Sequence, residues 1–119
     1  MITILVVVEA EADFRIASVL ADRVFREKAE PWVAENLDAL REWFGFFPES
    51  KFVCWKALHS VEGEMFEGKI PRMLGHLNGE PLGSDGVLAR RVLQMAKLAA
   101  QKTPSLKGIL LMKDVDTHN

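Results

Sequence analysis

A second cysteine, any tyrosine and an excess of basic residues are all missing from this chain of 119 residues. Because Cys54 is the single cysteine, an internal disulfide framework is excluded, and we expect a reducing, cytoplasmic environment. The formal net charge of −2 excludes nucleic-acid binding through bulk electrostatics, so any such contact needs local cations or a metal ion. The apolar run at residues 2–8 is too short to span a bilayer and lacks the basic start of a signal peptide. We therefore expect no membrane segment.

What the chain does contain is the composition of one ordinary globular domain, with 49% apolar and 27% charged residues. The three tryptophans and most of the phenylalanines lie between Trp32 and Trp55, which we interpret as core and not as a surface for stacking bases. We therefore expect residues 1–119 to form a single domain. We expect the chain to be either a piece of a longer protein or a reduced version of its fold.

The first half of the sequence predicts a strand, two helices and a second strand. Residues 2–8 are continuously apolar and mostly β-branched, which is typical of a strand buried on both faces. Apolar residues at helical spacing predict a helix over about residues 12–28, with a buried stripe made of Ala17, Leu20, Ala21 and Val24. A second helix is predicted from Pro31 to Trp43, and a second strand over residues 51–56.

The second half predicts a long loop, a helix and a third strand. Residues 59–84 are rich in glycine and proline, so we expect mostly loop, with room for a short helix near residues 69–77. A helix capped by Ser84 or Asp85 should end at Pro104 and bury one apolar face: Leu88, Val92, Met95, Ala96 and Ala99. Residues 107–112 form the last predicted strand. This order predicts a three-layer α/β fold, with a small, mainly parallel sheet flanked by helices.

Acidic residues follow two of the predicted strands directly. Glu9 comes after residues 2–8, and Asp114 and Asp116 come after residues 107–112. If these two strands are adjacent and parallel, the carboxylates meet at one edge of the sheet, where ligands bind in such folds. Crowded carboxylates need a cation, and hard divalent ions prefer oxygen ligands. The sequence therefore predicts Mg²⁺ or Mn²⁺ bound by Glu9, Asp114 and Asp116.

These residues carry a resemblance to the TOPRIM family. Val7-Val8-Glu9-Ala10-Glu11-Ala12-Asp13-Phe14 resembles its first motif, a glutamate at a strand end before an acidic helix start. Leu110-Leu111-Met112-Lys113-Asp114-Val115-Asp116 resembles its second, an Asp-x-Asp after a later strand. The family's glycine after the glutamate is Ala10 here, and the long separation of the two motifs requires an insertion at residues 30–84.

The resemblance implies a TOPRIM or Rossmann-like fold and metal-dependent phosphodiester chemistry on nucleic acid. Glu9 would be the general acid or base, and Asp114 with Asp116 would hold the metal. TOPRIM domains occur in topoisomerases, primases and nucleases associated with OLD-type ATPases, so the implied partners are nucleic acid and an ATPase. As nucleic-acid contacts we expect Arg90, Arg91 and Lys113, with Lys69 and Arg72 as further cations.

Two other classes of protein remain open. One is a non-enzymatic α/β interaction module whose acidic residues only favour helix starts and solubility. The other is a response-regulator receiver domain, because the chain has its length and a similar start. A receiver needs a phosphoacceptor aspartate at the end of its middle strand, and residues 52–58 end without one.

Overall fold

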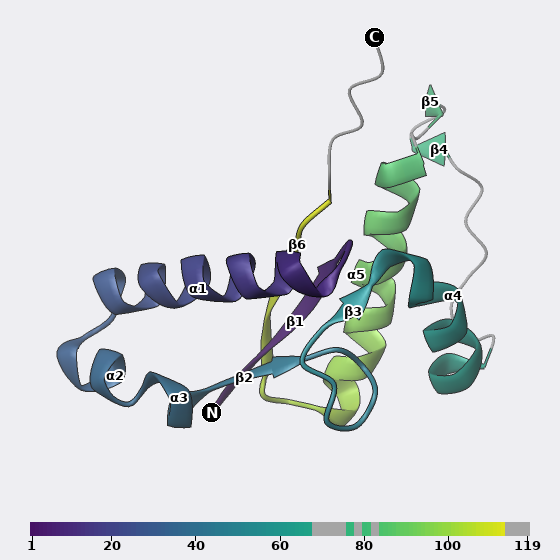
Figure 1. The fold of residues 1–119 in the computed structure, drawn as a ribbon. Coiled ribbons are helices and arrows are strands. Elements are labelled where there is room, and N and C mark those ends of the chain that lie inside the picture. The colour runs from purple at the N-terminus through teal and green to yellow at the C-terminus, as the bar shows by residue number, and fades with distance from the viewer. Residues whose placement is uncertain (68–75, 78–79, 82–83, 114–119) are drawn as a thin grey trace, which may run out of the picture.

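The structure is a computed structural model that describes residues 1–67, 76–77, 80–81 and 84–113. Its main feature is an open sheet of four parallel strands with helices on both faces (Figure 1). The predicted α/β class, a small and mainly parallel sheet flanked by helices, is confirmed. Within the described ranges, no helix is both long and apolar enough to cross a membrane.

Strand β1, Ile2–Val8, is the centre of the sheet. One side of β1 pairs with β6, Leu106–Leu111. The other side pairs first with β2, Arg41–Phe44, and then with β3, Val53–Cys54, so these two short strands follow each other along β1. The predicted adjacency of residues 2–8 and 107–112 is confirmed, and both strands run in the same direction.

The continuous apolar run of β1 reflects burial on two faces. Leu5 and Val7 lie in a core cluster against α5, Ser84–Lys102, while Ile4, Val6 and Val8 lie in a second cluster that includes Phe14 and Phe25 of α1, Glu11–Lys28. Five of these strand side chains are at most 6% exposed. Each contributes roughly 1.5–3 kcal/mol by leaving water, so the burial of β1 stabilises the fold substantially.

The predicted buried stripe of the first helix is only partly correct. Ala17 is buried, but Leu20 and Val24 are 51% and 55% exposed. The two phenylalanines of α1, three turns apart, set the face that meets the sheet. The consequence is an exposed apolar stripe on the outer side of α1: Ile16, Val19, Leu20 and Val24.

The predicted helix from Pro31 to Trp43 is interrupted at Asn36 and is wrong from Arg41 onward. Two short helices, α2 (Pro31–Glu35) and α3 (Leu37–Leu40), are separated at Asn36, where φ is −119° and ψ is 23°. The chain then becomes extended as β2. Trp43 and Phe44 belong to the clusters on opposite faces of the sheet, and only a strand places adjacent side chains in this way.

The described part of residues 59–84 contains more regular structure than the sequence predicts. Strand β3 is shorter than the expected strand at residues 51–56, and a turn of 3₁₀ helix, Trp55–Ala57, follows it. Next come α4, Leu58–Val61, and a turn of π-helix, η2, Glu62–Phe66. The short helix expected near residues 69–77 falls mostly outside the described residues. His76–Leu77 form strand β4, which pairs with β5, Glu80–Pro81.

The buried face predicted for α5 is confirmed at Val92, Met95, Ala96 and Ala99.

One arginine joins α1, α3 and β2. Arg41 donates two hydrogen bonds to Asp22, at 3.0 and 2.6 Å, and one to Asp38 at 3.0 Å. Its guanidinium also lies 4.5 Å from the centre of the Trp43 ring. The side chains of Arg41 and Asp22 are 10% and 15% exposed, whereas that of Asp38 is 90% exposed.

Asp22→Asn should therefore lower the free energy of unfolding by about 2 kcal/mol, because it removes a charge from a nearly buried pair. Asp38→Asn, which removes a carboxylate from the same arginine in water, should cost less than about 0.5 kcal/mol. Urea denaturation of both variants measures the difference. Equal losses would show that burial does not govern the strength of this network.

Candidate functional site

Three neighbouring strands end at one edge of the sheet, and the residues just after them meet there. Glu9 follows β1, Trp55 follows β3, and Lys113 lies two residues beyond β6. Because all three strands are parallel to one another, this edge collects their carboxyl ends. It is the edge at which open α/β sheets bind ligands.

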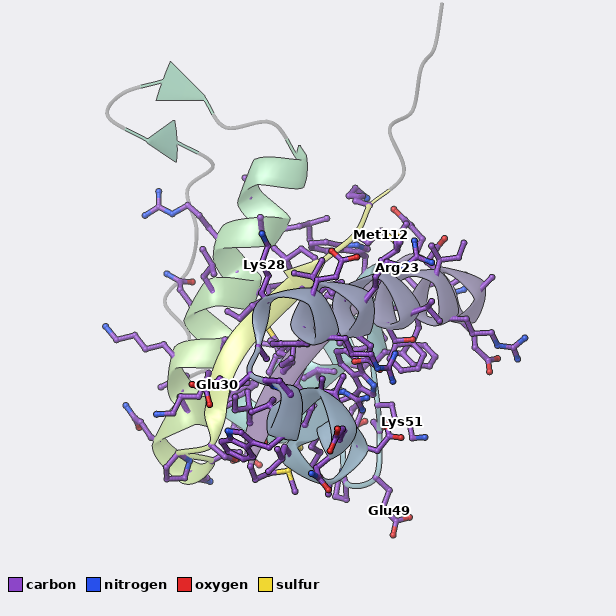
Figure 2. The ribbon with its side chains drawn as sticks, turned by 90° about the vertical axis from the view of Figure 1, so that its left-hand side faces the viewer. Arg23, Lys28, Glu30, Glu49, Lys51 and Met112 are labelled. Carbon is purple, nitrogen blue, oxygen red and sulfur yellow. The ribbon has the colours of Figure 1, made fainter. Side chains whose placement is uncertain are left out.

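Lys113 contacts both Glu9 and Trp55 at this edge. The Lys113 Nζ atom donates to Glu9 Oε1 at 3.2 Å and lies 5.6 Å from the centre of the Trp55 ring. The indole N–H of Trp55 donates to the carbonyl oxygen of Met112 at 2.8 Å. Figure 2 labels Met112 at the upper end of β6. Trp55 therefore fixes the end of β6 beside Glu9, and it also contributes an aromatic face to the site.

The acidic cluster from Glu9 to Asp13 separates into three different roles. Glu9 contacts Lys113, while Glu11 pairs with Arg15 at 3.3 Å on the surface of α1. Asp13 accepts a hydrogen bond from the backbone N–H of Ala10 at 3.0 Å, which satisfies a donor at the start of α1. Only Glu9 therefore faces the strand ends, and about a third of its side chain, 32%, is exposed.

The residues described at this edge supply one metal ligand and not a complete set. Among them, no group of three or more His, Cys, Asp and Glu side chains is placed to hold an ion. Glu9 provides carboxylate oxygens of the type that Mg²⁺ prefers. The other two predicted ligands, Asp114 and Asp116, lie outside the described residues, although Asp114 directly follows Lys113 in the sequence.

The three predicted nucleic-acid contacts are placed differently. Lys113 contacts Glu9 at the strand ends. Arg91 of α5 forms an ion pair with Glu62 of η2, through its Nε atom at 2.8 Å and through a second guanidinium nitrogen. Arg90 lies next to it on α5 and is partly exposed. The further cations Lys69 and Arg72 fall outside the described residues.

Trp55 is the site residue that the sequence reading missed. The sequence predicts that Trp55 lies in a strand and in the core, and Trp55 is indeed only 7% exposed. A buried tryptophan needs an acceptor for its indole N–H, and a position just after a strand end places that acceptor at the edge where the parallel strands end. This requirement is the signal that could have identified it.

The assignment of a function rests on these contacts and on the order of residues along the chain. Glu9 and Lys113 are far apart in sequence and joined by the pairing of β1 with β6, so the fold itself creates the site. Comparison of the chain with protein-family models, with curated proteins and with solved structures finds no match.

Proposed function

We propose that the carboxyl ends of β1 and β6 form a Mg²⁺- or Mn²⁺-dependent site for phosphodiester chemistry on nucleic acid. The single observation that carries this proposal is the pairing of β1 with β6, which places Lys113 Nζ 3.2 Å from Glu9. The two aspartates of the sequence begin at the residue after Lys113.

Each residue has a definite part in this chemistry. Glu9, Asp114 and Asp116 would hold the cation, which supplies a positive charge to polarise a phosphate oxygen. Glu9 would also handle the proton, because it is partly exposed and its carboxylate faces the edge where the substrate would bind. The Lys113 ammonium offsets the negative charge of Glu9 while no ion is present and offers a contact to a phosphate. Trp55 keeps the end of β6 in place.

Millimolar Mn²⁺ should raise the melting temperature of the wild-type domain. An ion that binds only the folded protein adds about 2.7 kcal/mol at a concentration one hundred times Kd. Thermal denaturation followed by circular dichroism, with and without Mn²⁺, measures this shift. Asp114→Asn should abolish it, because the variant removes a principal ligand.

Glu11→Gln is the matched control for this experiment. Glu11 lies two residues from Glu9 but pairs with Arg15 on the surface of α1. Its variant should therefore keep the full metal-dependent shift. If neither Mn²⁺ nor Mg²⁺ changes the melting temperature of the wild type, the metal site is contradicted, and the proposed chemistry with it.

A non-enzymatic interaction module is the second candidate. The observation that favours it is the apolar stripe of α1, whose four side chains Ile16, Val19, Leu20 and Val24 are all more than half exposed. Contiguous apolar surface of this kind commonly marks a contact with another protein. An absent metal shift together with self-association or complex formation through α1 would favour this reading.

A further inference from the structure

Strand β6 has one free edge in the described part of the chain. It pairs with β1 on one side, and no other described strand pairs with it on the opposite side. The N–H of Met112 donates to Val7 in β1, so by the alternation of a parallel ladder the backbone groups of Ile109 and Leu111 point away from β1. The free edge therefore offers unpaired N–H and C=O groups to an incoming strand.

The side chains beside this edge are apolar and incompletely covered. Ile109 and Leu111 are each 39% exposed, and Leu93 of α5 is 51% exposed. Between α5 and β6 runs a shallow groove of about 440 Å³, with Leu93, Ala96, Ala100 and Ile109 among its lining residues. Figure 2 shows β6 lying beside α5. The groove could thus receive alternate side chains of a strand added to β6.

The charges around the groove are all positive. Lys97 of α5 and Lys107 of β6 line it, both are exposed, and neither forms an ion pair with another described residue. Residues 86–113, which contain this part of α5 and all of β6, carry six lysines and arginines and no aspartate or glutamate. The protein as a whole has a net charge of −2, so this segment is a distinct basic region.

We propose that the free edge of β6 and the α5–β6 groove form a docking site for an acidic, extended segment of a partner protein. The partner would add a strand along Lys107–Leu111. On the face of this strand that meets the groove, apolar side chains would lie beside Ile109 and carboxylates would lie beside Lys97 and Lys107. A lysine at a sheet edge ordinarily deters strand pairing. An acidic strand converts that repulsion into attraction, which makes the site selective.

Two other occupants fit these observations less well. A second copy of the chain, paired through the same edge, would bring this basic segment against itself. Residues 86–113 supply no carboxylate to pair with its lysines and arginines, and like charges destabilise strand pairing. Nucleic acid would use the lysines, but its phosphate backbone gains nothing from exposed Leu93, Ile109 and Leu111.

The test is fluorescence anisotropy with a labelled peptide of seven residues. Its alternate, groove-facing positions are glutamate, valine, valine and glutamate, and threonine fills the positions between them. We expect saturable binding that weakens as salt is raised, and no binding of the matched peptide in which lysine replaces glutamate. Single-stranded DNA is titrated in parallel. Equal binding of the two peptides, no binding of either, or DNA binding alone would each overturn the proposal.

Variants locate the site and separate its two components. The double substitution Lys97→Glu with Lys107→Glu, both at exposed positions, should weaken the acidic peptide at least tenfold. Ile109→Pro removes an N–H that points away from β1, so it should weaken binding more than Ile109→Ala, which keeps that N–H. Unchanged affinity in the double variant would overturn the role of the charges, and equal effects of proline and alanine would overturn strand addition. The proposal does not depend on metal binding by Glu9, and Glu9→Gln should leave peptide binding unchanged.

Discussion

Gly45→Ala should destabilise the domain by about 4 kcal/mol. A methyl group at Gly45 would lie 2.2 Å from the carbonyl oxygen and 2.4 Å from the carbonyl carbon of Phe52. Both are backbone atoms, so the collision cannot be relieved by rotating a side chain, and overpacking of this severity belongs to the costly end of the range. The loop from Gly45 to Phe52 must open for the variant to fold.

The cost is large because this loop sets the register of the sheet edge. The chain leaves the sheet after β2, passes through this loop and re-enters the sheet at β3, so that both strands pair with β1. Gly45 N–H donates to the Ser50 carbonyl at 2.9 Å, and the buried Phe46 is held at φ 74° between Phe44 and Phe66. In contrast, Glu49 points away from the body of the protein in Figure 2. Opening the loop would thus disturb the aromatic core and not only its surface.

Gly63→Ala is the control for the glycine substitution. A methyl group there meets no atom within 4 Å, and Gly63 lies in the helical turn η2. Alanine should leave stability unchanged or raise it by up to about 1 kcal/mol, because it restricts the unfolded chain. Guanidinium denaturation of both variants measures the contrast. A loss of less than about 1 kcal/mol for Gly45→Ala would show that the loop adapts freely.

The central strand and its partner were predictable because their sequence patterns have one physical solution. A run of seven mostly β-branched residues, six of them apolar, is stable only if both faces are covered, and helices on either side of a sheet provide that cover. Residues 109–112 carry a shorter apolar run. The parallel pairing of β1 with β6 then follows from the helices between them, and the structure has this arrangement.

Strand β2 was not predictable by the same reasoning. The apolar positions Val33, Leu37, Leu40 and Phe44 fit a helical period, and nothing local marks a change to strand after Leu40. Tertiary contacts favour a strand at residues 41–44. Arg41 donates a hydrogen bond to Asp22 of α1, and the centre of the Trp43 ring lies 6.0 Å from that of Phe14. Partners this distant in sequence leave no periodic signal, so the helix pattern was extended too far.

The candidate site was predictable in position but not in its contacts. A carboxylate after a buried parallel strand identifies Glu9, and the parallel neighbour identifies the residues after β6. The sequence predicts that Lys113 contacts nucleic acid, whereas in the structure Lys113 forms an ion pair with Glu9. That pairing depends on the relative register of β1 and β6. The continuous apolar run of β1 has no alternation between apolar and polar residues, so its pattern does not set this register.

Glu9→Gln should lower metal-dependent nucleic-acid cleavage by at least about a hundredfold, the scale of a general acid or base. This prediction rests on the proposed function. Glutamine keeps the size of the side chain and an oxygen for Lys113, so the strand ends should stay in place while the proton acceptor is lost. Most metal binding should persist through Asp114 and Asp116. The measurement is nicking of plasmid DNA, and cleavage of single-stranded DNA and RNA, with Mg²⁺ and with Mn²⁺.

Three companion measurements make the result interpretable. Glu11→Gln, a neighbouring carboxylate that pairs with Arg15, should cleave like the wild type. Lys113→Gln should weaken substrate binding and reduce its salt dependence by about one released counterion, because it removes one phosphate contact. It should change the catalytic rate much less than Glu9→Gln does. Equal residual cleavage by the wild type and Glu9→Gln would indicate a contaminating nuclease and take the proton-handling role from Glu9. Absence of cleavage in both, despite a metal-dependent rise in melting temperature, would leave a metal-binding domain whose chemistry requires a partner.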